Sequence, residues 1–190
     1  AQRNAFNIEG LGEKIILQLL EEGIIADPAD LYFLKKEDFI SLSFFKEKKT
    51  QNILNAIQKS KEITLDRFIF GLGIRYLGEQ GSTEFATYLI GEKKNYSIRE
   101  FLHDIKKISF EELNNLDGIG EKVAQGIHDY FQNEKNIQLI EKLDQADIKI
   151  IVPMADKNKK KTAIFGKSFV LTGSLTFMTR DEAKSKIKSL

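Results

Sequence analysis

Two segments far apart in this chain repeat one short pattern of glycine, apolar and charged residues. Residues 9–16 read Glu-Gly-Leu-Gly-Glu-Lys-Ile-Ile, and residues 117–124 read Asp-Gly-Ile-Gly-Glu-Lys-Val-Ala. An apolar residue, Ile8 or Leu116, precedes each copy, and each copy leads into a segment with helical apolar periodicity. Such a repeat indicates that one supersecondary unit occurs more than once and buries its apolar face against its neighbours.

The pattern has a specific consequence at the point where each helix begins. Glycines permit a tight turn and a close approach of the backbone to a partner, because they carry no Cβ. The amides of the first helical turn have no intrahelical acceptor, and together with the helix dipole they attract an anion. A lysine in that turn adds a positive charge. Phosphate contacts are therefore predicted at Gly10, Gly12 and Lys14 in the first copy and at Gly118, Gly120 and Lys122 in the last.

A degenerate copy occupies residues 42–48. It keeps the apolar residue and the Glu-Lys pair, but Phe44 and Lys46 stand at the positions of the two glycines. Bulky side chains at those positions oppose a close approach of the backbone to phosphate. This copy is therefore expected to be mainly structural, with Lys48 as a candidate contact.

A further degenerate copy occupies residues 73–79. It keeps the second glycine, Gly78, and has Tyr76 in place of the first. Gly78 and the neighbouring Arg75 are candidate phosphate contacts. The four copies are spaced by roughly 30 to 40 residues, which suits four units arranged in two pairs that bury each other's apolar faces.

The rest of the chain up to about Ala146 is also helical in pattern, so the predicted fold class is mostly α. Gly23 is expected to end the first helix, and Asp27 followed by Pro28 to begin the next. Phenylalanines such as Phe39 and Phe68 are expected in the core. Three Ser/Thr-x-x-Glu capping boxes mark helix starts at Ser97 with Glu100, Ser109 with Glu112 and Thr179 with Glu182.

The pattern changes after Ala146. β-Branched residues followed by a lysine-rich run predict an extended segment and basic linker over 147–163. Residues 164–190 then read as one strand and one helix, which cannot enclose a core by themselves. We therefore expect domain boundaries of 1–146, 147–163 and 164–190, the last being the incomplete start of an α/β domain.

Charge and composition limit the function classes that remain. The chain has 29 basic and 28 acidic side chains, but nine basic and three acidic ones fall between Ala155 and Leu190, which gives that segment +6 and the rest −5. A body of negative net charge cannot hold nucleic acid by a general basic surface, so contacts there must be local. The chain has no cysteine, which excludes disulfides and thiolate zinc sites. No apolar run approaches the ~20 residues of a membrane span.

The repeated pattern resembles the helix-hairpin-helix motif. Residues 3–12, 30–34, 68–79 and 116–124, followed by Val-Leu-Thr-Gly-Ser-Leu at 170–175, resemble in this order the C-terminal half of bacterial NAD-dependent DNA ligases. The last block resembles the opening of a BRCT domain. The resemblance covers almost the whole chain.

The resemblance implies a segment that grips duplex DNA across its minor groove on both sides of a nick, without sequence preference. The parent enzyme seals nicks between a 5′-phosphate and a 3′-hydroxyl in replication and repair, and uses NAD, Mg²⁺ and a structural Zn²⁺. Upstream adenylation, OB and zinc-finger domains of the same polypeptide are implied partners, and the location is expected to be cytoplasmic and nucleoid-associated. Because the chain has neither cysteine nor a Lys-x-Asp-Gly motif, no catalytic, cofactor or metal residue is assigned here.

Other interpretations stay open from the sequence. The glycines can be ordinary turn residues, and Lys14 and Lys122 can be solvated lysines paired with a neighbouring glutamate. The two histidines, His103 and His128, are expected to have no catalytic role. Two rival functions are a helical module that binds protein and the DNA-binding tail of a repair nuclease. If DNA is the ligand, the two copies with intact glycines should dominate the affinity.

Overall fold

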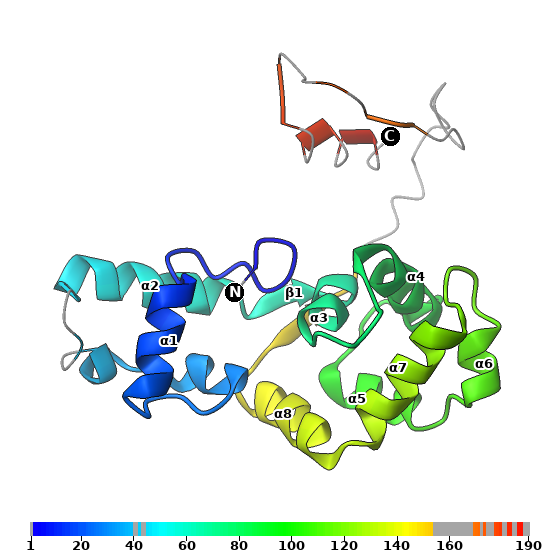
Figure 1. Cartoon of the computed structure of the whole chain (residues 1–190), viewed down its shortest axis with the longest axis horizontal. Helices are drawn as coiled ribbons and strands as arrows, with labels where there is room; N and C mark the ends of the chain where they lie inside the picture. Colours follow the sequence, from blue (N-terminus) through cyan, green and yellow to red (C-terminus); the bar gives the residue numbers. More distant parts are fainter. Residues whose placement is uncertain are drawn as a thin grey trace. The chain divides into compact units, whose positions relative to one another are not determined.

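A computed structural model describes residues 2–39, 42, 45–153, 169–171, 173, 177–179, 182–183 and 186–187. It divides the chain into unit 1, Ala1–Pro153, and unit 2, Met154–Leu190, which are described separately. Unit 1 is mostly helical, as predicted (Figure 1). Its elements, with 3₁₀ helices written η, are α1 (Glu13–Glu21), η1 (Pro28–Phe33), η2 (Lys36–Phe39), α2 (Glu47–Lys59), β1 (Glu62–Thr64), α3 (Leu65–Gly71), α4 (Glu79–Ile90), α5 (Ile98–Ile105), α6 (Phe110–Asn114), α7 (Glu121–Gln132), α8 (Glu134–Gln145) and β2 (Lys149–Ile151).

The helix ends predicted from local sequence are confirmed. The hydroxyls of Ser97 and Ser109 each accept a hydrogen bond from the amide three residues later, at 3.2 Å. The glutamate at that later position accepts a bond from the serine amide at 2.8 Å. Asp27 caps η1 with its carboxylate and Pro28 follows at the first helical position. Gly23 adopts a left-handed φ of 66° just past the end of α1. These ends are specified by residues within four positions of one another.

A row of aromatic rings runs through the core of unit 1. Phe6, Phe68, Phe101 and Phe131 contact one another in sequence at centroid separations of 5.9, 5.6 and 5.6 Å, each pair edge to face. Phe68 and Phe101 are fully buried. Phe39 is also buried, as expected. In Figure 1, α3, which carries Phe68, lies between α1 and α2 on one side and α4, α6 and α7 on the other. The row of rings therefore joins the N-terminal helices of unit 1 to its later helices.

A short parallel pairing brings the end of unit 1 back to its middle. Strand β2 pairs with β1, with Ile150 opposite Ile63. The extended character after Ala146 was predicted, but this segment was assigned to a linker outside the helical domain. By its pairing it belongs to unit 1, which extends to Pro153. The partner strand lies more than 80 residues earlier, so no local pattern could indicate it. The lysine-rich run at 157–161 lies outside the described residues.

Unit 2 is described only in part. Most of the expected strand at 165–172 lies outside the described residues, and Phe169, Val170 and Leu171 carry no regular secondary structure. The predicted capping box is present: the Thr179 amide donates to the Glu182 carboxylate at 2.7 Å and the Glu182 amide donates to the Thr179 hydroxyl at 3.2 Å. A helical start at this point is therefore confirmed.

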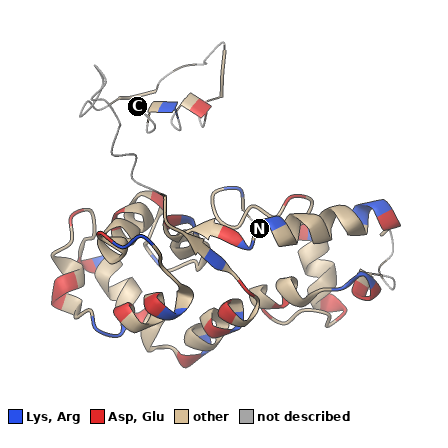
Figure 2. Cartoon of the chain, turned by 180° about the vertical axis from the view of Figure 1, so that it is seen from behind, with Lys and Arg blue, Asp and Glu red and all other residues tan. Residues whose placement is uncertain are grey.

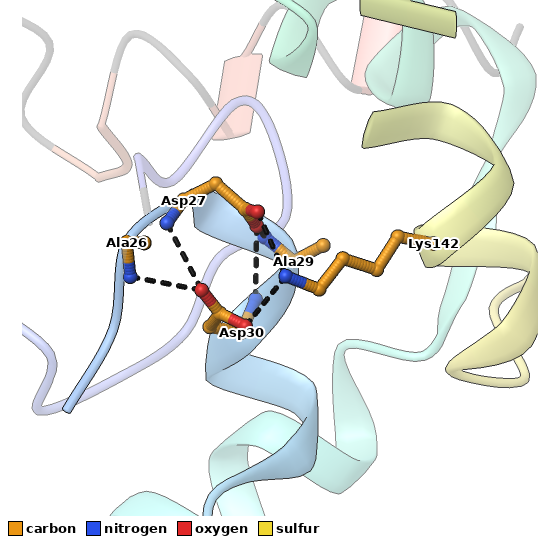
Figure 3. A network of polar contacts seen from close by, with 5 residues as sticks. All are labelled: Ala26, Asp27, Ala29, Asp30 and Lys142. Carbon is orange, nitrogen blue, oxygen red and sulfur yellow. Dashed lines mark hydrogen bonds and ion pairs between the residues drawn. The ribbon is translucent and has the colours of Figure 1, made fainter. Parts of the chain in front are cut away.

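A network of ion pairs and hydrogen bonds, which we call the Lys142 network, joins η1 to α8 (Figure 3). The Lys142 ammonium donates to Asp27 Oδ2 at 2.8 Å and to Asp30 Oδ1 at 2.6 Å. Asp27 also accepts from the amide of Ala29, and Asp30 from the amide of Ala26, each at 2.8 Å. The helix cap of η1 therefore also fixes α8, which begins more than 100 residues later.

The pKa values of Asp30 and Lys142 define the pH range over which this network stabilises the fold. Partial burial acts to raise the pKa of Asp30, but hydrogen bonds from Lys142 and from the amides of Ala26 and Asp27 outweigh it and hold the pKa below 3.8. Hydrogen bonds to Asp27 and Asp30 raise the pKa of Lys142 above 10.5. The stabilisation is thus lost as the pH falls through the lowered pKa of Asp30, or rises through the raised pKa of Lys142.

We expect Lys142→Met to lower the free energy of unfolding at pH 7 by about 1 kcal/mol, since partly exposed ion pairs contribute about this much. Urea denaturation measures the change. The difference from the unsubstituted chain should shrink as the pH is lowered through the depressed pKa of Asp30, where this carboxylate binds a proton. Lys135→Met on the same helix is the control, because Lys135 is exposed and has no ion-pair partner among the described residues. A difference that stays constant with pH would contradict this account.

Candidate nucleic-acid interface

Four helices of unit 1, α1, α2, α4 and α7, share an extended N-cap residue and the same backbone hydrogen bond just before it. We call the five residues up to each N-cap a corner: corner 1 is 8–12, corner 2 is 42–46, corner 3 is 74–78 and corner 4 is 116–120. In each, the amide of the fourth residue donates to the carbonyl of the first: Leu11 to Ile8 at 3.3 Å, Phe45 to Leu42 at 3.3 Å, Leu77 to Ile74 at 3.1 Å and Ile119 to Leu116 at 3.0 Å.

The corners leave helix amides without a side-chain acceptor. The N-cap residues Gly12, Lys46, Gly78 and Gly120 are extended, and none has a side chain that accepts a hydrogen bond from the helix that it begins. By contrast, η1, α5, α6 and α8 have N-cap side chains that accept such bonds; α3, which begins after Thr64 without a corner, also lacks one. Unpaired amides at a helix start, with the positive end of the helix dipole, form an anion site.

The glycine N-caps are open to solvent. A Cβ placed on Gly12, Gly78 or Gly120 would meet no atom within 4 Å. The predicted contact residues are all exposed: Gly10, Gly12, Lys14, Lys48, Arg75, Gly78, Gly118, Gly120 and Lys122. A ligand can therefore reach the amides of corners 1, 3 and 4. That these residues contact phosphate stays a prediction.

The backbone of corner 3 follows that of the two glycine-rich corners. Gly10 and Gly118 have left-handed φ angles of 80° and 77°, and Tyr76 at the same position has a φ of 66°. The sequence indicated a degenerate turn here, because tyrosine rarely adopts this conformation. The structure shows that the turn is kept and that the tyrosine conforms to it. Phe44, the corresponding residue of corner 2, lies outside the described residues.

Corners 3 and 4 pack reciprocally, each against the helix that follows the other. A Cβ on Gly126 of α7 would collide with the backbone carbonyl of Arg75 in corner 3. A Cβ on Gly118 in corner 4 would collide with the carboxylate of Glu84 on α4. Glu84 and Gly126 each stand six residues after the N-cap of their helix. The two units are therefore related by an exchange of equivalent contacts.

Sequence reasoning missed both residues of this exchange. A glycine in a helix interior has poor helix propensity and indicates a close approach, which was an available signal for Gly126. No pattern indicated Glu84. Its Oε1 accepts a hydrogen bond from Gln80 at 2.8 Å, while Oε2 is buried without a partner among the described residues. The carboxylate lies against Gly118 where a Cβ would stand, whereas a Cβ on Gly120 would meet no atom within 4 Å.

The cations at the corners are available for a ligand. Lys14, Lys48, Lys122 and Arg75 form no ion pair with any residue that the structure describes, so the interpretation of Lys14 and Lys122 as glutamate-paired lysines is not supported. Arg75 and Lys122 are brought together on the rim of a shallow depression of about 470 Å³ between corner 3 and α7. The Arg75 guanidinium lies over the ring of Tyr76, 4.8 Å from its centroid.

Acidic residues accompany every corner. The first residue of each following helix is a glutamate: Glu13, Glu47, Glu79 or Glu121. A glutamate there interacts favourably with the helix dipole when no other anion is bound. Figure 2 shows acidic and basic residues interspersed along the helices of unit 1. The electrostatics therefore favour phosphate binding at individual corners over attraction by one basic face.

Acidic side chains and histidines do not cluster into a metal site in the described part of the chain. No group of three or more His, Asp or Glu side chains among them could hold a metal ion. His128 packs edge to face against Phe110 at 6.3 Å, and His103 is exposed on α5. None of the helices in the described part of the chain is long and apolar enough to cross a bilayer.

We expect Gly126→Ala to lower the free energy of unfolding by about 1 kcal/mol or more. Alanine is the better helix former by about 1 kcal/mol, but the overlap with the Arg75 carbonyl is backbone overpacking, which costs about 1–3 kcal/mol. Urea denaturation checks this, with Gln125→Ala at the neighbouring exposed position as the control. A Gly126→Ala chain more stable than the original would show that corner 3 does not rest on α7 as described.

Comparison with known proteins agrees with this geometry. A family model for a SAM-like helix-hairpin-helix tandem matches residues 4–59, and a model for the helix-hairpin-helix motif matches residues 67–140. The matches include all four corners.

The chain is also similar to a part of several bacterial DNA ligases. The DNA ligase of Bacillus subtilis (strain 168) is 41% identical over 191 residues, and that of Bacillus velezensis is 39% identical over the same length. The DNA ligase of Bacillus licheniformis is 38% identical over 195 residues. Each alignment covers 99% of this chain but 27% of the relative, so the chain spans about a quarter of their length. The chain is therefore similar along its length to a segment of bacterial DNA ligases, and it carries tandem helix-hairpin-helix motifs.

Proposed function

We propose that this chain is the part of an NAD-dependent DNA ligase that grips duplex DNA on both sides of a nick. The observation that carries the proposal is the repeated corner: four helices begin with one backbone geometry and with no side chain to cap their amides. Four such units, in two pairs, would follow the two sugar-phosphate strands across the minor groove. The relatives named DNA ligase support the same role.

The proposed contacts are to phosphate and not to base edges. Backbone amides at helix starts and single lysines recognise the charge and spacing of phosphates, which are the same for every sequence. Binding should therefore be independent of sequence and should weaken steeply with salt. The parent enzyme would join the 5′-phosphate and 3′-hydroxyl of the nick, and this segment would position the DNA without taking part in covalent chemistry.

The cofactors of the proposed parent enzyme would be held elsewhere. A structural Zn²⁺ of the four-cysteine kind does not fit this chain, which has no cysteine. No residue is assigned to NAD or Mg²⁺, and the described residues contain no metal-binding cluster. Adenylation, OB and zinc-finger domains of the same polypeptide are the proposed partners, unit 2 is proposed to begin a BRCT domain, and the proposed location is with the bacterial nucleoid.

We expect Lys122→Ala to weaken the binding of a nicked duplex and to reduce the slope of log K against log salt by about 0.9, the value of one phosphate contact. Lys14→Ala should do the same at corner 1, and both changes should exceed the effect of Lys48→Ala at corner 2. Fluorescence anisotropy with a labelled nicked duplex at four or five salt concentrations measures affinity and slope together.

The control is Lys135→Ala. Lys135 lies at the start of α8, beyond the end of α7 opposite Lys122; α7 alone extends roughly 15 Å from Lys122 to Gln132, so the change should leave both quantities unchanged. Identical slopes for the original chain and for Lys122→Ala would count against a phosphate contact at corner 4. A chain that binds no duplex at low salt would instead favour the rival interpretation, a module that binds protein.

A further inference from the structure

Tyr76 has an unusual backbone conformation for its residue type. Among the described non-glycine residues, Asn7, Tyr76 and Asp147 have positive φ angles, of 49°, 66° and 67°. Asn and Asp enter the left-handed region readily because their short side chains bond locally, whereas a bulky residue there is strained. The equivalent positions Gly10 and Gly118 meet the same requirement without strain. The conformation of Tyr76 therefore costs free energy that glycine would save.

The fold does not recover this cost by packing the ring. Tyr76 is 57% exposed and does not belong to the apolar residues packed against the core. Its hydroxyl makes no hydrogen bond with the described residues, and the ring contact that the structure gives it is the Arg75 guanidinium at 4.8 Å. Arg75 is itself exposed and bears no carboxylate partner in the described part of the chain. Strain without internal compensation is typical of residues kept for a binding role.

The surroundings of the ring define the chemistry of its ligand. Tyr76 lines the depression together with two cations, Arg75 and Lys122, and with one carboxylate, Asp129, which accepts a hydrogen bond from Gln125. It also stands two residues before Gly78, whose helix offers uncapped amides. An exposed apolar ring next to amides and cations matches an alternation of apolar sugar and anionic phosphate. With phosphates at the Gly78 amides and beside Arg75 and Lys122, as the proposed function has it, the apolar part of the backbone that the ring would meet is a sugar.

We propose that the Tyr76 ring packs against a deoxyribose of the bound duplex, next to the phosphate held at corner 3. This inference rests on the proposed DNA-binding function and extends it, because it adds an apolar contact to a set of ionic ones. Corners 1 and 4, which have glycine at this position, bind through amides and lysines alone. Corner 3 lacks the lysine, with Gln80 in its place, and has the Arg75–Tyr76 pair instead.

The test replaces Tyr76 in the 190-residue chain with glycine and with asparagine, both of which accept the left-handed conformation without an aromatic ring. Thermal stability should stay equal or rise. Affinity for a nicked duplex should fall on the order of 5-fold at every salt concentration, as expected for the loss of one partly buried ring contact. The salt slope should not change, since no charge is removed. Tyr76→Phe should bind like the original chain.

Tyr88→Ala is the matched control. Tyr88 is an exposed tyrosine on α4, about 15 Å along the helix axis from Gly78, and its loss should leave affinity unchanged. Undiminished affinity of Tyr76→Gly would overturn the proposal, as would a loss with glycine that asparagine does not reproduce, because backbone flexibility would then be the cause. A larger loss for single-stranded than for duplex DNA would show base stacking in place of a sugar contact. Failure of the original chain to bind duplex at low salt would refute the proposed function itself.

Discussion

Unpaired backbone amides at the starts of four helices are the constraint on which the rest of this structure depends. Hydrogen-bonding groups at a helix end need partners, and at four other helices of unit 1 side chains such as Ser97, Ser109 and Asp27 provide them. At the four corners no side chain does so. The protein thus leaves part of its own backbone free for the proposed ligand, which would explain how a segment of net charge −5 can be suited to a polyanion.

A binding group made of backbone has to be held in place by packing, because it has no side-chain torsions with which to adjust. Corners 3 and 4 are fixed by exchanging contacts with each other's helices through Gly126 and Glu84. The aromatic row from Phe6 to Phe131 runs through the core of unit 1, and the Lys142 network joins η1 to α8. Packing in the core therefore fixes the distances between the corners, and these distances would set the spacing of the phosphates that the corners contact.

The sequence predicted helix ends better than it predicted partners. The capping boxes, the stop at Gly23 and the corner glycines were found because each depends on residues within a few positions along the chain. The pairing of β2 with β1 and the bond from Lys142 to Asp27 were not found, since their partners are separated by more than 80 residues. The boundary expected at Ala146 fell too early for the same reason.

Taken alone, the amino-acid sequence determined that this protein is mostly helical, that a glycine-rich helix start recurs, and which lysines accompany it. Only the tertiary structure decided that Tyr76 adopts the conformation of a corner glycine, that the Glu84 carboxylate packs against Gly118, and that the backbone of Arg75 packs closely against Gly126. The physical reason is range. Helix starts are settled by hydrogen bonds between near neighbours, whereas the exposure of a corner depends on which distant surface packs against it.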